Sequence, residues 1–254
     1  MTEAPRERTI SDVIERMTRL LDGLPSELAA RRAFLATYLR TTRAVEKAIE
    51  GAAFEDPAWV EAWDVVFADL YLDALESDLS TDPDRRTPRP WALAFAAPTD
   101  LSALRQVLLG INAHINYDLP QALLGVISDE DFADPVLLDR RRRDHERIDG
   151  VLAGRIAAED DELSTQSAKG LLDRLLTPLN RRASTRFLRE ARMKVWHNAI
   201  ELQHARVAGH EAYAVRLAEL ELLSAARIAD LLAPGQVLLR LAVAGFGVVL
   251  PPEV

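Results

Sequence analysis

Cysteine is absent from the 254 residues, and lysine occurs only three times. Without cysteine the chain can form no disulfide, thiolate metal site or thiol nucleophile, so histidine, aspartate, glutamate and water remain as metal ligands. Basic residues are in deficit too, because 31 Lys and Arg face 40 Asp and Glu, a net charge of −9. An acidic chain is poorly suited to bind a phosphate backbone, and we therefore expect no nucleic-acid partner.

Long apolar runs are also missing. The longest, residues 237–250, is interrupted by Arg240 and contains two glycines. It is shorter than the ~20 residues needed to cross a bilayer, so we expect a buried closing element and no membrane binding. Residues 1–9 are polar and lack the apolar core of a secretory signal, which predicts a cytoplasmic protein.

Alternating strand patterns do not extend beyond a few residues, whereas apolar residues at helical spacing run through most of the chain. Nothing in the composition requires a second core. The sequence therefore predicts an all-α single domain of about eight helices over residues 1–254, with residues 1–8 as a tail. The expected helices cover residues 9–21, 26–49, a segment opened by Pro57, 99–119, 136–158, 184–206 and 211–232.

Capping residues set the expected helix starts. Asp56–Pro57 and Asp134–Pro135 each place a capping carboxylate before a proline, whose missing N–H costs nothing in a first turn. Ser26 and Thr99–Asp100 are expected to cap two further helices. Four prolines within residues 80–98 predict a long ordered loop over the surface, because they forbid one continuous helix.

The most informative stretch is residues 110–120, where polar side chains continue the apolar stripe of the expected helix 99–119. His114 and Asp118 both fall on that stripe. An imidazole and a carboxylate are costly to bury without partners, so we expect a metal, a substrate or another side chain to satisfy them. Pro120 removes a backbone donor, and the helix should end or kink beside the pair.

The same spacing of histidine and acid recurs on two other expected helices, in His145–Asp149 and in His197–Glu201. Imidazole and carboxylate groups suit zinc, iron or manganese, and helical bundles commonly hold such ions. The candidate metal ligands are therefore His114, Asp118, His145, Asp149, His197 and Glu201. His145, however, lies in the charged run 140–146, which is typical of a solvated face.

Two readings of the His114 region follow. In the first, the protein is an enzyme that acts on a small molecule, as a metal-assisted hydrolase or lyase. His114 and Asp118 hold the ion, and Tyr117 or Asn116 orients the substrate. In the second, the protein is a non-catalytic binding or scaffold protein, and the His114–Asp118 pair only locks helices together.

A third reading rests on Asp69, Asp73 and Glu76, which fall at helical steps beside an apolar face containing Trp63, Phe67 and Tyr71. Carboxylates at this spacing can hold magnesium against a diphosphate, as in an isoprenoid-type cyclase. The simpler interpretation is the solvated edge of an amphipathic helix. We expect the aromatic face to pack toward His114.

Residues 109–120 (LGINAHINYDLP), together with 54–57 and 66–75, resemble an actinobacterial all-helical family of unknown function. The resemblance covers about residues 9–200 and implies one helical domain without an assigned activity. The His114–Asp118 pair, followed by His145–Asp149 or His197–Glu201, is more weakly similar to the zinc-dependent phospholipase C and nuclease P1 fold. That family also uses an amino-terminal Trp ligand and earlier histidines, and no histidine here precedes His114, so one or two ions at most are implied.

Overall fold

The computed structural model describes residues 8–162, 178–235, 245 and 247–252. Within these residues the chain is an all-α single domain without strands, as the sequence predicted. The helices are α1 (Ile10–Gly23), α2 (Ala29–Glu50), α3 (Pro57–Leu79), α4 (Arg89–Phe95), α5 (Ala103–Ala113), the π-helical turn η1 (His114–Asp118), α6 (Leu119–Val126), α7 (Asp129–Ala133), α8 (Pro135–Glu162), α10 (Pro178–Ala208) and α11 (His210–Leu232).

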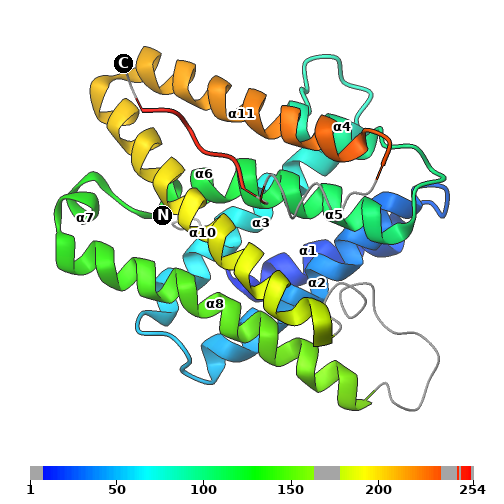
Figure 1. Ribbon diagram of the computed structural model, residues 1–254, viewed down its shortest axis with the longest axis horizontal. Coiled ribbons are helices and arrows are strands. Elements are labelled where there is room, and N and C mark those ends of the chain that lie inside the picture. Colours follow the sequence, from blue (N-terminus) through cyan, green and yellow to red (C-terminus); the bar gives the residue numbers. More distant parts are fainter. Residues whose placement is uncertain (1–7, 163–177, 236–244, 246, 253–254) are drawn as a thin grey trace, which may run out of the picture.

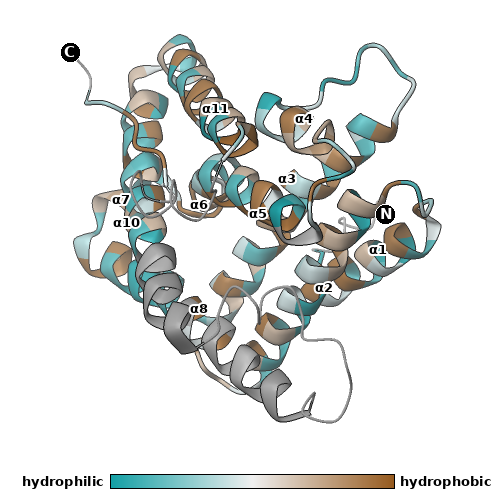
Figure 2. Ribbon diagram, turned by 45° about the vertical axis from the view of Figure 1, so that its right-hand side comes forward, coloured by the Kyte–Doolittle hydropathy of each residue, from teal (hydrophilic) through white to brown (hydrophobic). Residues whose placement is uncertain are grey.

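Helices α5, η1 and α6 follow one another through the centre of the molecule (Figure 1). Helix α2 packs on α5, both α3 and α10 pack on α6, and α11 packs on α4 and α5. Hydrophobic and hydrophilic residues alternate along most of these helices, which is the pattern of amphipathic helices (Figure 2). These three consecutive elements, the central rod, are therefore covered from several sides. Their polar residues lie inside the core.

Three of the expected helix starts are confirmed. Thr9 caps α1 in a capping box with Asp12, and Asp56 accepts a hydrogen bond from the backbone N–H of Trp59 at the start of α3. Asp134 likewise accepts from two backbone N–H groups in the first turn of α8. In the two Asp–Pro pairs the proline follows its capping carboxylate directly.

Two predicted caps are wrong. Ser26 lies before α2, which begins at Ala29 without a side-chain cap. Helix α5 begins after Ser102, whose hydroxyl accepts from the N–H of Arg105, rather than after Thr99–Asp100. In both places several residues able to cap stand close together, and their local chemistry does not distinguish among them.

The predicted surface loop over residues 80–98 is also wrong in part, because it contains helix α4. Pro90 stands in the first turn of α4, where a missing N–H is tolerated, so this proline begins a helix instead of preventing one. Trp91 on α4 is fully buried. The segment is therefore part of the core.

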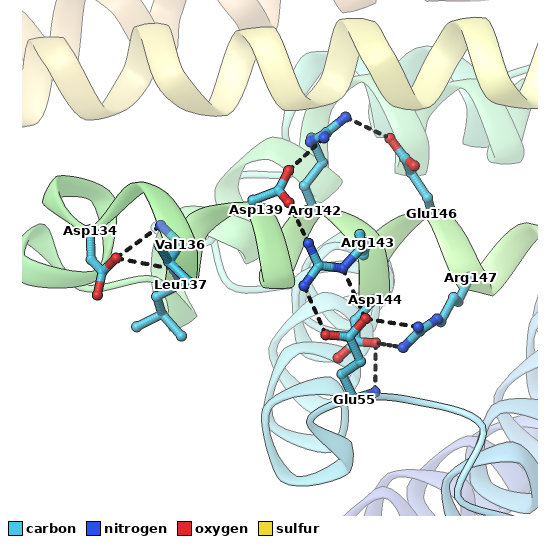
Figure 3. A network of polar contacts seen from close by, with 10 residues as sticks. All are labelled: Glu55, Asp134, Val136, Leu137, Asp139, Arg142, Arg143, Asp144, Glu146 and Arg147. Carbon is cyan, nitrogen blue, oxygen red and sulfur yellow. Dashed lines mark hydrogen bonds and ion pairs between the residues drawn. The ribbon is translucent and has the colours of Figure 1, made fainter.

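The charged run on α8 fixes this helix to the start of α3 and is not simply a solvated face. Asp144 is fully buried and accepts from the backbone N–H groups of Glu55 and Asp56, each at 2.8 Å. The side chain of Glu55 pairs in turn with Arg143 and Arg147 (Figure 3). His145, the next residue along α8, is also buried.

In the later part of the chain, the described part of α10 begins at Pro178. Of the expected closing element 237–250, residues 237–244 and 246 lie outside the described residues, and Leu250 is buried. The helices that the structure describes include none long and apolar enough to cross a membrane.

Gly110 allows α2 and α5 to approach closely. A Cβ atom at this position would lie 2.4 Å from the Phe34 ring. We predict that Gly110→Ala destabilises the protein, because overpacking of about 1–3 kcal/mol outweighs the gain of about 1 kcal/mol in helix propensity. Urea unfolding of both proteins measures the difference.

Gly150 on α8 is the matched control, because a Cβ there meets no atom within 4 Å. Gly150→Ala should stabilise the protein by about 0.5–1 kcal/mol through helix propensity alone. Equal effects of the two substitutions would contradict the close approach at Gly110.

Candidate functional site

The predicted polar stretch forms a π-helical turn, His114–Asp118, between α5 and α6. The backbone N–H of Leu119 donates to the carbonyl of His114, five residues earlier. Pro120 has no N–H for the carbonyl of Asn116, which removes one bond of a regular α-helix. The expected local disruption at Pro120 is thus a widened turn, a feature that frequently marks functional sites.

His114 and Asp118 are buried, as the sequence predicted, and they form a hydrogen-bonded pair. His114 Nδ1 lies 2.8 Å from Asp118 Oδ2, and the residues are only 4% and 1% exposed. Trp91 Nε1 from α4 donates to the same carboxylate oxygen, also at 2.8 Å. Two donors from separate elements therefore fix the orientation of the carboxylate, which in turn fixes the imidazole.

Aromatic rings enclose the imidazole. The Phe67 ring stacks on it with a centroid distance of 3.6 Å and an interplanar angle of 4°, and the Tyr38 ring meets it edge-on at 4.5 Å. Three further rings lie about 6 Å away, those of Phe34, Tyr71 and Trp91. The aromatic face of α3 packs toward His114 as predicted, although Trp63 on that face contacts His145 instead.

Burial keeps the imidazole neutral at neutral pH. It lowers the pKa of His114 below the ordinary value of 6.5, and the hydrogen bond and charge of Asp118 oppose this only in part. The bond to the carboxylate assigns the proton to Nδ1, which leaves a lone pair on Nε2. This Nε2 atom is buried and has no hydrogen-bond partner among the described residues.

The Tyr38 and Tyr71 rings beside His114 carry buried hydroxyl groups that also lack partners in the described part of the chain. The same holds for Asp64 Oδ2, whose charge acts on Tyr38. Burial and the charge of Glu61 raise the pKa of Asp64 to about 7. Burial also raises the pKa of Tyr38, and the charges of Asp64 and Asp118 add to this rise. Tyr38 therefore lies within electrostatic reach of both carboxyl groups.

Sequence reasoning missed Tyr38, Asp64 and Trp91. Asp64 shows the same feature as His114, a polar residue in the apolar stripe of a helix. It falls four residues after Val60 and four before Ala68, both fully buried. The ring of Tyr38 makes it look like one of the apolar positions of its helix, and Trp91 lies in the segment expected to be a loop. The periodicity of α3 alone would have identified Asp64 as a buried carboxyl group.

Asn116 and Tyr117 lie on the other side of the π-helical turn. The Asn116 amide donates to Asn112 Oδ1 at 3.2 Å, and its Oδ1 accepts from the N–H of Val248 at 3.3 Å. Tyr117 packs in an apolar cluster with Leu250. The structure therefore brings His114 and Asp118 together with Tyr38 and Trp91 and does not bring Asn116 or Tyr117 to the imidazole.

The other candidate metal ligands do not join the His114–Asp118 pair. His145 contacts Trp63 and Trp196, His197 Nε2 lies 3.2 Å from the Leu250 carbonyl, and Glu201 pairs with Arg216. The side chain of Asp149 lies outside the described residues. No group of three potential ligands converges in the part of the chain that the structure describes, so these donors do not fit the predicted zinc, iron or manganese site.

The carboxylates proposed for magnesium are paired with arginine. Arg16 lies 2.8 Å from Asp69 and 2.9 Å from both Asp73 and Glu76, and Arg8 also pairs with Asp69. A guanidinium group occupies the place that a cation would take. These carboxylates thus join α1 to α3, in keeping with the simpler interpretation of a helix edge.

The buried carboxyl group of Asp64 predicts a measurable pH dependence. Its folded-state pKa of about 7 lies above the ordinary value of 3.8, so the folded protein holds this proton more tightly than the unfolded chain. This contribution to stability is present at low pH and is lost as the pH rises from about 4 to 7. We expect Asp64→Asn to be more stable than the wild type at pH 8 and to lose most of this advantage by pH 5.

Urea unfolding across this pH range checks the prediction, and Asp73→Asn, whose carboxylate is exposed, is the control. The difference between wild type and variant isolates Asp64 from His114 and His145, whose pKa values are lowered by burial. Those histidines act in the opposite direction, because they weaken the folded state as the pH falls below 6.5. A difference that stays constant from pH 5 to 8 would contradict the raised pKa.

Comparison with known proteins gives a family without an assigned activity. No curated protein and no solved structure matches the chain. A family model described as a family of unknown function, DUF5995, matches residues 10–234, which include the whole π-helical turn and its aromatic surroundings. The chain belongs to this family.

Proposed function

We propose that the protein is an enzyme that acts on a small molecule by general acid–base catalysis, as a hydrolase or lyase, with His114 as the base. The observation that supports this most directly is the unpartnered Nε2 of a buried, oriented imidazole. A buried polar atom without a partner costs about 1–3 kcal/mol, and such a cost is more readily explained by a ligand than by packing.

Each residue of the site has a role in this proposal. His114 Nε2 takes a proton from water or from a carbon next to a carbonyl group, and the resulting imidazolium ion is stabilised by Asp118. Trp91 holds the carboxylate in place. The imidazolium ion then returns this proton to the leaving group.

The enclosing rings favour a small, uncharged substrate. Phe67, Tyr38 and Tyr71 surround the imidazole with apolar surface, while the Tyr38 hydroxyl supplies one hydrogen-bond donor. A charged substrate would meet no buried arginine or lysine among these contacts. We therefore place the substrate among neutral carbonyl compounds, such as short esters.

The alternative function is a non-catalytic binding or scaffold protein in which the same pair only joins helices. The observation that favours it is the close stacking of Phe67 on His114, which leaves little space beside the ring. Under this alternative the pair contributes to stability and to no reaction.

Ester hydrolysis tests the proposal. Wild-type protein is assayed with p-nitrophenyl acetate and its propionyl and butyryl homologues, beside His114→Gln and Asp118→Asn. We expect His114→Gln to lower kcat/KM by about 10²–10⁴-fold, the usual contribution of a general base. The wild-type rate should rise with pH through the lowered pKa of His114 and be flat above pH 6.5, because only the neutral imidazole acts as the base.

His204→Gln is the matched control, because His204 is exposed on α10 and should leave the rate unchanged. Circular dichroism confirms that each variant is folded, and Asp118→Asn preserves the shape of the site if His114→Gln does not fold. Equal rates of wild type and His114→Gln with every ester would overturn the catalytic proposal in favour of the structural alternative.

A further inference from the structure

The C-terminal segment, residues 247–252, lies as an extended chain against α10 and α11 (Figure 1). It has no helix of its own. Its main-chain groups bond to side chains of other elements, and these contacts do not depend on the side chains of the segment itself.

Asn198 on α10 forms hydrogen bonds with two main-chain groups of this segment. Its Nδ2 donates to the carbonyl of Val248 at 3.0 Å, and its Oδ1 accepts from the N–H of Leu250 at 2.9 Å. The two edges of one amide thus match groups two residues apart, which lie on the same side of an extended chain. Any extended backbone offers this pattern.

Four other side chains bond to the same backbone. Lys194 Nζ donates to the carbonyl of Gly247 at 3.3 Å, and His197 Nε2 donates to that of Leu250 at 3.2 Å. Arg216 donates to the carbonyl of Pro251, and Asn116 accepts from the N–H of Val248. The donors come from α10 and α11, and the acceptor Asn116 comes from the π-helical turn.

Two positions of the segment are selective for their side chains. Leu250 is fully buried in an apolar cluster with Tyr117, Leu124, Leu202 and Leu220. A Cβ atom at Gly247 would lie 3.3 Å from the backbone of Ala191 and 2.7 Å from the Lys194 side chain, which favours glycine there. Val249 between them is 45% exposed.

We propose that α10, α11 and the π-helical turn form a binding site for an extended peptide of the pattern Gly-x-x-Leu. Residues 247–252 fill this site within the chain, and a partner with the same kind of segment displaces them. Main-chain bonds supply affinity and the two selective positions supply specificity, as in other modes of extended-peptide recognition. The proposal does not depend on the proposed catalytic function.

Peptide binding to the full-length chain tests this site. The probe is a fluorescent synthetic peptide with the sequence of residues 245–252, and its binding is followed by anisotropy. Leu250→Asp should release the internal segment, because a carboxylate is costly in an apolar cluster. We expect this variant to bind the probe at least tenfold more tightly than the wild type, in which the internal segment competes.

Val249→Asp is the matched control from the same segment and should bind the probe as weakly as the wild type. A probe with Asp at the position of Leu250, or Val at that of Gly247, should bind at least tenfold more weakly to Leu250→Asp. Addition of Asn198→Ala to Leu250→Asp should also weaken binding. Circular dichroism checks folding, and Leu250→Ala replaces Leu250→Asp if the latter unfolds.

Two results would overturn the proposal. One is equal affinity of the wild type and the folded Leu250 variant for the probe, which would mean that no exchangeable site exists. The other is equal binding of the probe and its Asp-containing counterpart, which would show nonspecific adsorption to apolar surface.

Discussion

The structure around the π-helical turn depends on the hydrogen bonds to one oxygen atom, Asp118 Oδ2. This atom accepts from His114 Nδ1 and from Trp91 Nε1. An isolated carboxylate could not remain charged at this depth, and the two N–H donors offset part of its desolvation. The position of α4 against η1 and the orientation of the imidazole therefore follow from the same two bonds.

The sequence predicted the fold and the central pair because both depend on regular spacing. Apolar periodicity identified the long helices, and two Asp–Pro pairs marked helix starts. His114 and Asp118 were found because they continue an apolar stripe with polar groups, which local sequence shows directly. Helical spacing places the two side chains within reach of each other, and the apolar stripe predicts their burial.

The surroundings of the pair could not be predicted in the same way, because they depend on contacts between distant segments. Trp91 lies 27 residues from Asp118, in a proline-rich segment whose short helix has too few residues to show periodicity. The four-residue spacing between each of His145 and His197 and its acidic partner is also a local property. It does not show which part of the molecule these side chains point toward. Contacts from distant segments decide this, because Asp144 bonds to the backbone before α3 and His145 lies beside Trp63 and Trp196.

The π-helical turn distributes its polar residues over two sides of the central rod. Residues four apart in a helix share a face, whereas residues two apart point to nearly opposite sides. His114 and Asp118 thereby face the aromatic rings of α2, α3 and α4, while Asn116 faces the C-terminal segment. Asn116 therefore lies in the same turn as the imidazole, on the side that contacts the C-terminal segment and away from the aromatic rings.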